Sequence, residues 1–223
     1  MVSKLQQGIK EMQNQNFEEA AKLFTEAIDE EPKNPIGYIN FGNLLLHMSD
    51  YSRAQRFFER AIELDEHAAT AYFGLGNTYY EQSLYPQAQE QFSKAVETGL
   101  EEADVYFMLG MTFVHQDHHK LALPYLLRAA ELDSDDVDIQ FQYGLCLAQA
   151  GEIAQAKATM LKVLELESEH SDAYYNLGVI ALYEENPIQA LEYFDRAIEI
   201  QPEHALAANG KKQIEQVLHN DQD

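Results

Sequence analysis

Apolar positions along the chain recur at helical spacing and are interrupted at regular intervals by short polar segments. In the middle of the chain this pattern predicts one helix from about Ala71 to Gln82 and a second helix that ends near Gly99. The segment Ser83–Tyr85 separates them, and Pro86 suits the first position of the second helix, where its missing N–H would have no partner. Gly99 suits a left-handed residue just after a helix. The pattern therefore predicts an all-α protein built from helical hairpins.

The helical hairpins recur with a fixed period of 34 residues. Six glycines mark this period, an alanine follows each of them after twelve residues, and a second small residue follows seven positions later. Such a period predicts one helical unit that is repeated and stacked on its neighbours. The three sets are Gly8, Gly42, Gly76, Gly110, Gly144 and Gly178; Ala20, Ala54, Ala88, Ala122, Ala156 and Ala190; and Ala27, Ala61, Ala95, Ala129, Val163 and Ala197.

The period divides the chain into six predicted units and a C-terminal remnant. We expect residues 1–204 to form a single solenoid, residues 205–219 to form a capping helix, and residues 220–223 to form a frayed tail. The first unit carries Lys4 and Glu11 where later units carry aromatics and leucines, as expected at the open end of an array. The units are 1–34, 35–68, 69–102, 103–136, 137–170 and 171–204. In the capping helix we expect Leu206, Ile214, Val217 and Leu218 to pack and Lys211, Lys212, Glu215 and Gln216 to face water.

The repeated residues resemble the tetratricopeptide repeat, whose pattern is an aromatic, Leu-Gly, an aromatic, Ala-x3-Phe and a terminal Pro. The third unit matches it with Tyr72, Leu75-Gly76, Tyr79 and Ala88-x3-Phe92. Two departures are local: Gln140 replaces an aromatic, and Pro124 lies inside a predicted helix, which it is expected to bend. The resemblance covers residues 1–204 and implies a right-handed α-solenoid of stacked antiparallel helix pairs. It also implies that the first helix of each unit lines a concave groove.

The resemblance further implies that unit positions 2, 5, 6, 9, 12 and 13 face this groove. Three kinds of side chain occur there: a row of apolar and aromatic residues at position 5, asparagines at positions 6 and 9, and aspartates at position 2. We therefore expect the groove to bind a segment of a partner protein. The candidate partner-binding residues are Asn40, Asn43, Phe73, Asn77, Asp104, Phe107, Asp138, Phe141, Asp172, Tyr175 and Asn176.

Each kind of candidate residue also has a structural explanation. Aromatics at helical spacing often belong to a core, and an aspartate that opens a helix complements the positive end of its dipole. Asn43 and Asn77 are harder to explain in this way, because asparagine is a mediocre helix former and both lie inside predicted helices. A side-chain amide can donate to and accept from the backbone of an extended peptide. We therefore favour a binding role for the asparagines and leave both interpretations open for the other two kinds.

The charge of the chain restricts the kind of partner. The sequence contains 38 acidic and 15 basic residues, which give a formal net charge of −23. This balance argues against nucleic acid and disfavours an anionic membrane surface, and it favours a basic or basic-apolar segment of another protein. Members of the family that bind chaperone tails grip the terminal carboxylate with Lys and Arg, which makes such tails unlikely ligands here. The corresponding positions hold Ile39, Phe73, Phe107, Thr70 and Gly74.

Candidate chemistry is sparse, so we expect no catalysis, no cofactor and no resident metal. His115, His118 and His119 have a spacing that could hold a metal, but His119 occupies a position that other units fill with an aromatic ring. Cys146 is the only cysteine, and its unit position is apolar elsewhere, which predicts a buried and inert thiol. No apolar leader or membrane-spanning run is evident, so a cytoplasmic location is expected.

The sequence thus predicts a non-catalytic scaffold or adaptor that binds a partner segment in an acidic, aromatic-lined groove. Two alternatives stay open. The chain could be a self-associating structural or assembly subunit that uses its array ends or convex face, and a homo-oligomer could pair through the apolar stripe of Leu5, Ile9 and Met12. It could also be an accessory subunit that positions an enzyme.

Overall fold

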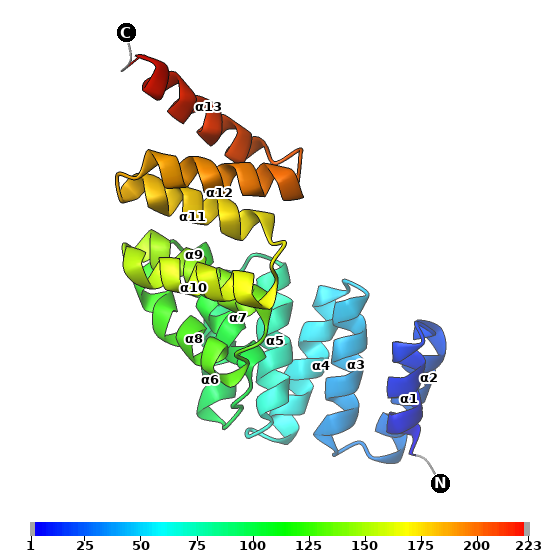
Figure 1. The fold of residues 1–223 in the computed structure, drawn as a ribbon. Coiled ribbons are helices and arrows are strands. Elements are labelled where there is room, and N and C mark those ends of the chain that lie inside the picture. The colour runs from blue at the N-terminus through cyan, green and yellow to red at the C-terminus, as the bar shows by residue number, and fades with distance from the viewer. Residues whose placement is uncertain (1–2, 221–223) are drawn as a thin grey trace. The chain divides into compact units, whose positions relative to one another are not determined.

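A computed structural model describes the backbone of residues 3–220 and the side chains of residues 3–217. Within this range the chain forms thirteen α-helices and no strand, which confirms the predicted all-α class (Figure 1). The helices are α1 Lys4–Gln13, α2 Phe17–Glu30, α3 Pro35–His47, α4 Tyr51–Leu64, α5 Ala69–Glu81, α6 Tyr85–Glu97, α7 Ala103–His115, α8 His119–Leu132, α9 Val137–Ala150, α10 Ile153–Leu166, α11 Ser171–Tyr183, α12 Pro187–Ile200 and α13 Ala205–Asn220.

The helices belong to two compact units, Met1–His118 and His119–Asp223. In the first unit each helix packs against the next one along the chain, and the odd-numbered helices also touch one another, α1 with α3, α3 with α5, and α5 with α7. In the second unit consecutive helices from α8 to α13 pack in the same sequential way. This sequence of antiparallel neighbours is the stacked arrangement that the 34-residue period predicts.

At several of the periodic glycines a buried phenylalanine ring fills the space that the absent side chain leaves, whereas at Gly144 the side chain of Met160 does so. The ring of Phe58 lies between Gly42 and Gly74, and a Cβ atom added at Gly42 would approach its Cε1 atom to 2.8 Å. The ring of Phe194 is fully buried between Gly178 and Gly210 in the same way. Real Cβ atoms essentially never come within 3.0 Å of such a neighbour, so these positions tolerate only glycine. The glycines therefore make room for a ring from the neighbouring helix.

A left-handed residue ends the first helix of every predicted unit. Five of the six are not glycine, and their φ angles lie between 58° and 63°. At Ser49 the turn is closed by two backbone hydrogen bonds, from Ser49 N–H to Leu46 O at 2.9 Å and from Asp50 N–H to Leu45 O at 2.8 Å. These bonds satisfy carbonyls that the helix end leaves without partners. The six residues are Gln15, Ser49, Ser83, Asp117, Gly151 and Glu185.

The first and last residues of α5 and α6 lie within two residues of the predicted helix boundaries. Helix α6 begins one residue before Pro86, and Gly99 is left-handed with a φ of 98°, as predicted. Helix α8 continues through Pro124 without interruption. The buried Gln140, which replaces an aromatic, donates hydrogen bonds to the carbonyls of Ala130 and Ser134 at 3.1 and 3.2 Å. Each departure from the repeat pattern is thus accommodated locally.

The C-terminal helix α13 only partly follows its predicted division. Ile214 is buried as expected, but Leu206 and Val217 are 59% and 58% exposed, so two of the predicted packing residues face solvent. Lys211, predicted to face water, instead forms an ion pair with Asp195 of α12 at 2.5 Å. Helix α13 includes Asn220, and the rest of the predicted tail, together with the side chain of residue 218, lies outside the described residues.

Candidate functional site

All eleven predicted site residues lie on odd-numbered helices, and none of them is buried. Six belong to the first compact unit and five to the second. Asn40 and Asn43 lie on α3, Phe73 and Asn77 on α5, Asp104 and Phe107 on α7, Asp138 and Phe141 on α9, and Asp172, Tyr175 and Asn176 on α11. Because α3 touches α5 and α5 touches α7, the first six residues lie on a row of contacting helices.

The structure separates the asparagines into two classes. The side-chain amides of Asn40 and Asn176 donate to carbonyls of their own helices, at Ile36 O (2.8 Å) and Asp172 O (2.7 Å). The side chains of Asn43 and Asn77 make no hydrogen bond within the part of the chain that the structure describes. Their donors and acceptors are therefore available to a ligand, whereas Asn40 and Asn176 each already use a donor.

The aromatic residues are half-buried, and several of them pack against a second ring. The ring of Phe73 lies 5.7 Å from that of Phe92, and the ring of Phe141 lies 4.6 Å from the imidazole of His170. Tyr175 packs against both Phe194 at 5.8 Å and His204 at 5.2 Å. Each of these three rings thus packs against the fold on one side and keeps part of its surface exposed, which supports the core interpretation, and the binding role stays a prediction.

The aspartates lie in the first turns of α7, α9 and α11, where a carboxylate complements the helix dipole. Asp172 has a further structural contact, because its Oδ1 atom lies 3.1 Å from Nε2 of His204. Nδ1 of the same imidazole accepts the backbone N–H of Ala207 at 3.2 Å and so caps the start of α13. Asp104 and Asp138 are exposed and form no ion pair among the described residues. These two are the better candidates for a basic ligand group.

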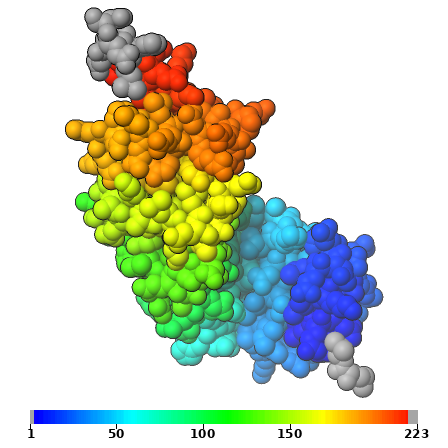
Figure 2. Space-filling model, in the orientation of Figure 1, coloured from blue at the N-terminus to red at the C-terminus, as the bar shows by residue number. Residues whose placement is uncertain are grey.

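An exposed apolar face on α11 was not among the predicted site residues. Val179, Leu182 and Tyr183 are 42%, 39% and 73% exposed and lie three and four residues apart, so they share one face of the helix. Figure 2 shows the side chains of α11 and α12 as one continuous surface. The signal was present in the sequence, since all three occupy groove-facing unit positions 9, 12 and 13.

A hollow of about 320 Å³ lies between α1 and α3 in the first unit. Asn43 is the predicted site residue that lines it, and the imidazole of His47 stands at its edge with the ring of Phe17 packed edge-on at 5.0 Å. The hollow is lined by Met12, Gln13, Asn43, Leu46 and His47. A free amide beside a hollow of this size is the part of the predicted site that most resembles a binding pocket.

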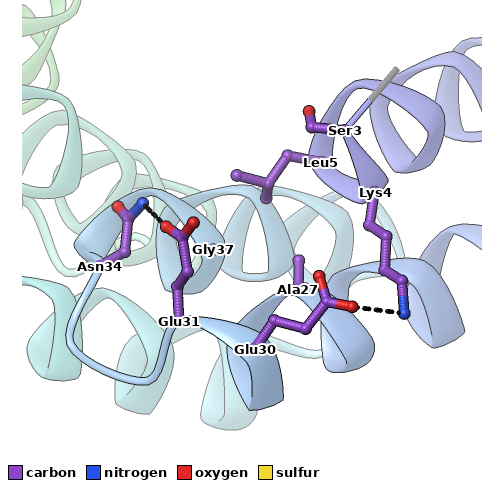
Figure 3. Close-up of a pocket in the computed structure, with 8 residues that line it drawn as sticks. All are labelled: Ser3, Lys4, Leu5, Ala27, Glu30, Glu31, Asn34 and Gly37. Carbon is purple, nitrogen blue, oxygen red and sulfur yellow. Dashed lines mark hydrogen bonds and ion pairs between the residues drawn. The ribbon is translucent and has the colours of Figure 1, made fainter. Parts of the chain in front are cut away.

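A second hollow, at the N-terminal edge of the first unit, is closed by charged residues (Figure 3). Lys4 forms ion pairs with Glu26 at 2.7 Å and with Glu30 at 2.9 Å. Hydrogen bonds to these two carboxylates raise the pKa of Lys4, and the bond from Lys4 lowers the pKa of Glu26. The volume is about 50 Å³, far below the roughly 150 Å³ that holds a benzene molecule. This hollow is therefore part of the packing of α1 on α2.

The apolar stripe of the first helix is used within the first unit. Leu5, Ile9 and Met12 pack against the buried cluster of Ala20, Phe24 and Leu44. The stripe predicted to pair two copies is therefore largely covered by the fold itself.

The residues with potential chemistry are held in structural roles. Cys146 is 1% exposed, its thiol lies 3.3 Å from the carbonyl of His119, and burial raises the pKa of the thiol to about 11. The imidazole of His115 stacks on Tyr85 with ring centroids 4.7 Å apart. Within the described residues no group of three or more His, Cys, Asp or Glu side chains could hold a metal ion. In the same range no helix is long and apolar enough to cross a bilayer.

Comparison with known sequences identifies the repeat directly. Three family models of the tetratricopeptide repeat match the chain, one at residues 36–98, one at residues 75–137 and 107–158, and one at residues 171–204. No curated protein sequence matched the chain. The matches fall in both compact units and together extend over more than half of the sequence.

Solved structures with the same fold include one of substantial sequence identity. YrrB, described as a TPR protein with an unusual peptide-binding site, is 46% identical over 86% of this chain and 99% of its own, with a TM-score of 0.82. PilF of Pseudomonas aeruginosa is 16% identical over 94% of this chain and 96% of its own, with a TM-score of 0.80. MamA is 24% identical over 74% of this chain and 96% of its own, with a TM-score of 0.69. The last two show the fold alone. The chain therefore belongs to the tetratricopeptide repeat family, whose tandem helical hairpins serve as protein-interaction scaffolds.

Proposed function

We propose that this protein is a non-catalytic adaptor that binds an extended segment of a partner protein along its odd-numbered helices. The observation that carries the proposal is the pair of free side-chain amides of Asn43 and Asn77 on contacting helices, with Asn43 beside the 320 Å³ hollow. An exposed asparagine inside a helix costs helix stability relative to alanine, and a ligand that needs the amide would explain its presence.

In the proposed complex the three kinds of side chain have separate roles. Asn43 and Asn77 hold the backbone of the partner segment, and the exposed edges of Phe73 and Phe107 contact its apolar side chains. Asp104, Asp138 and, less freely, Asp172 select lysine or arginine, in keeping with the net charge of −23. The partner is therefore a basic or basic-apolar protein segment rather than nucleic acid, an anionic membrane surface or an acidic chaperone tail.

The likeness to YrrB supports peptide binding, because that relative is 46% identical and is described as having a peptide-binding site. We also propose that the six units form a single solenoid over residues 1–204, with α13 as its cap. The outer side of α13 supports the cap, since Ala208, Lys212 and Glu215 are exposed there. A cytoplasmic location stays a prediction from the sequence.

Affinity capture with matched variants tests the proposal. The test bait carries Asn43→Ala, Asn77→Ala and Phe107→Ala, and the control bait carries Ser52→Ala, Gln87→Ala and Leu127→Ala, which are exposed on even-numbered helices. We expect the native and control baits to retain a partner that the test bait loses and that high salt releases. A partner retained equally by all three baits would show that the interface does not lie on the odd-numbered helices.

The acidic component is tested separately at one position. Asp138→Lys is expected to weaken binding of the captured segment more than Asp138→Ala, because the lysine adds repulsion to the loss of attraction. If binding is insensitive both to salt and to this pair of variants, the aspartates do not contribute to it. The proposed role of the asparagines is unaffected by that result.

A further inference from the structure

We infer that the hollow between α1 and α3 is a pocket for one aromatic side chain with a polar atom at its far end, such as tyrosine or tryptophan. The inference rests on the proposed function, because it names the anchor residue of the bound segment. It adds Met12, Gln13, Leu46 and His47 to a site in which only Asn43 was expected from the sequence.

The size of the hollow limits its occupant. A volume of about 320 Å³ lies at the lower end of the range of small-molecule pockets, roughly 300 to 1,000 Å³. It accommodates a single large side chain and is too small for a helix. The lining comes from the last turn of α1 and the second half of α3, which are in direct contact, so the pocket is preformed.

The apolar part of the lining is held in place by the core. Met12 packs against the buried cluster of Ala20, Phe24 and Leu44, and Leu46 packs against the cluster that contains Leu45 and Phe58. Both side chains remain partly exposed toward the hollow. A thioether also makes favourable contacts with an aromatic ring, which favours an aromatic over an aliphatic occupant.

The side-chain amides in the lining are free to bind. The side-chain amides of Gln13 and Asn43 form no hydrogen bond within the described residues. The imidazole of His47 is positioned by its edge-on contact with Phe17. These groups can both donate to and accept from a hydroxyl or an indole N–H. No carboxylate or ammonium group lines the hollow, so a charged side chain would gain no counter-ion there.

The pocket thus differs in chemistry from the predicted acidic site residues. Asp104 and Asp138 suit basic side chains, whereas the hollow suits a neutral one with an apolar body. A partner segment that uses both would carry an aromatic residue at one end and basic residues elsewhere.

The pocket is tested on the full chain by NMR titration with N-acetyl-tyrosinamide at millimolar concentration. N-acetyl-alaninamide and N-acetyl-lysinamide serve as controls for the backbone amide and for a long charged side chain. We expect the tyrosine probe to shift the signals of Gln13, Asn43 and His47, and the two controls to leave them unchanged. No shift with the tyrosine probe, or an equal shift with the lysine probe, would overturn the pocket.

A matched pair of substitutions places the effect in the hollow. Leu46→Asp adds a charge to the pocket, and Leu182→Asp adds the same charge at the equivalent position of α11, outside it. We expect the first to weaken the tyrosine probe at least tenfold and the second to leave its affinity unchanged. Gln13→Glu is a second test at an exposed position that the core does not depend on, and a severalfold loss is expected. Equal affinities in all three variants would contradict the inference.

The outcome separates this inference from the proposed function. If the tyrosine probe fails but the partner is still lost with the Asn43, Asn77 and Phe107 variant, the odd-numbered helices bind without this pocket. If the probe binds but the partner is retained by that variant, the pocket exists and the proposed adaptor surface is wrong.

Discussion

Helices α3 and α11 have the same length and the same place in the repeat, yet their exposed faces differ. On the buried side, Gly42 and Gly178 each leave room for a phenylalanine ring of the next helix. On the exposed side, α3 carries the free amide of Asn43 where α11 carries Val179. The last turn continues this difference, with an imidazole in α3 and the largely exposed Tyr183 in α11.

The comparison shows which positions the packing of the fold restricts and which it leaves free to vary. A position that faces a bulky buried side chain at close range favours glycine, and glycine recurs at this position every 34 residues. A position on the exposed face has no such constraint, and its side chain varies between units without changing the backbone. Variation on the exposed face of the odd-numbered helices is compatible with a binding surface on a constant scaffold.

The largest difference in stability is expected between substitutions at two adjacent residues of α11, one on its buried side and one on its exposed side. Gly178→Ala places a Cβ atom against the ring of Phe194 at less than 3.0 Å. Overpacking of this kind is expected to lower the free energy of unfolding by about 2 to 3 kcal/mol. Val179→Ala, one residue away and 42% exposed, should lower it by less than about 0.5 kcal/mol. Urea denaturation of both variants measures the difference, and equal losses would remove the distinction between the two faces.

A smaller loss of stability is expected when the side chain that caps the start of α13 is removed. His204 is 6% exposed and accepts the backbone N–H of Ala207, so His204→Ala should lower the free energy of unfolding by about 1 kcal/mol through loss of the cap. His204→Asn keeps a capping acceptor and should recover most of this loss, although it removes the contact with Asp172. If asparagine and alanine are equally destabilising, the contact with Asp172 rather than the cap carries the stability.

The turns after the first helices allow a comparison of opposite sign. Gly151 has a φ of 89°, so Gly151→Ala should cost about 1 kcal/mol in the free energy of unfolding. Ser49 adopts a φ of 58° in the equivalent turn, and Ser49→Gly should leave the free energy of unfolding unchanged or raise it by about 0.5 kcal/mol. Thermal unfolding of the two variants shows whether each substitution lowers or raises the stability. Destabilisation by Ser49→Gly would mean that the serine side chain contributes more than its backbone strain costs.

The smallest effect concerns a unit position that is buried in α3, α5, α7, α9 and α11. Cys146 corresponds to Leu44 in α3 and to Ile180 in α11, and all three are buried. Because burial raises the pKa of the thiol to about 11, the thiolate that reacts with alkylating agents is scarce at pH 8. Iodoacetamide should therefore label Cys146 only in denaturant, with a midpoint that matches unfolding by circular dichroism. Rapid labelling of the native protein would show that this side of α9 is open.

The sequence predicted the periodic features and missed those that depend on side-chain conformation. The period of small residues was sufficient for the helical hairpins, and Gly99 was correctly expected to be left-handed. Gln15 and Ser49 are also left-handed, but neither residue type signals that conformation, which is stabilised by backbone bonds of the preceding helix. Lys211 was expected to face water and instead reaches Asp195, because its long side chain can turn back toward α12.

The candidate site was predicted as a surface but not in its detail. Asn40 and Asn43 lie three residues apart on one helix, and only the structure shows that the first donates to its own backbone while the second is free. Asp172 and His204 are 32 residues apart, so their contact could not be derived from local pattern. The hollow beside Asn43 depends on how α1 meets α3, which no sequence period specifies.

The most direct test of the binding surface is photo-crosslinking from a single position. A benzophenone side chain is introduced at Asn40, which is partly exposed on α3 and has no role in the proposed complex, and at Ser52, which is exposed on the neighbouring α4. The protein and its captured partner are then irradiated, and the crosslinked peptides are identified by mass spectrometry. The account predicts crosslinks from position 40 to a basic segment with an aromatic residue, and few or none from position 52. Efficient crosslinking from position 52 with none from position 40 would contradict it.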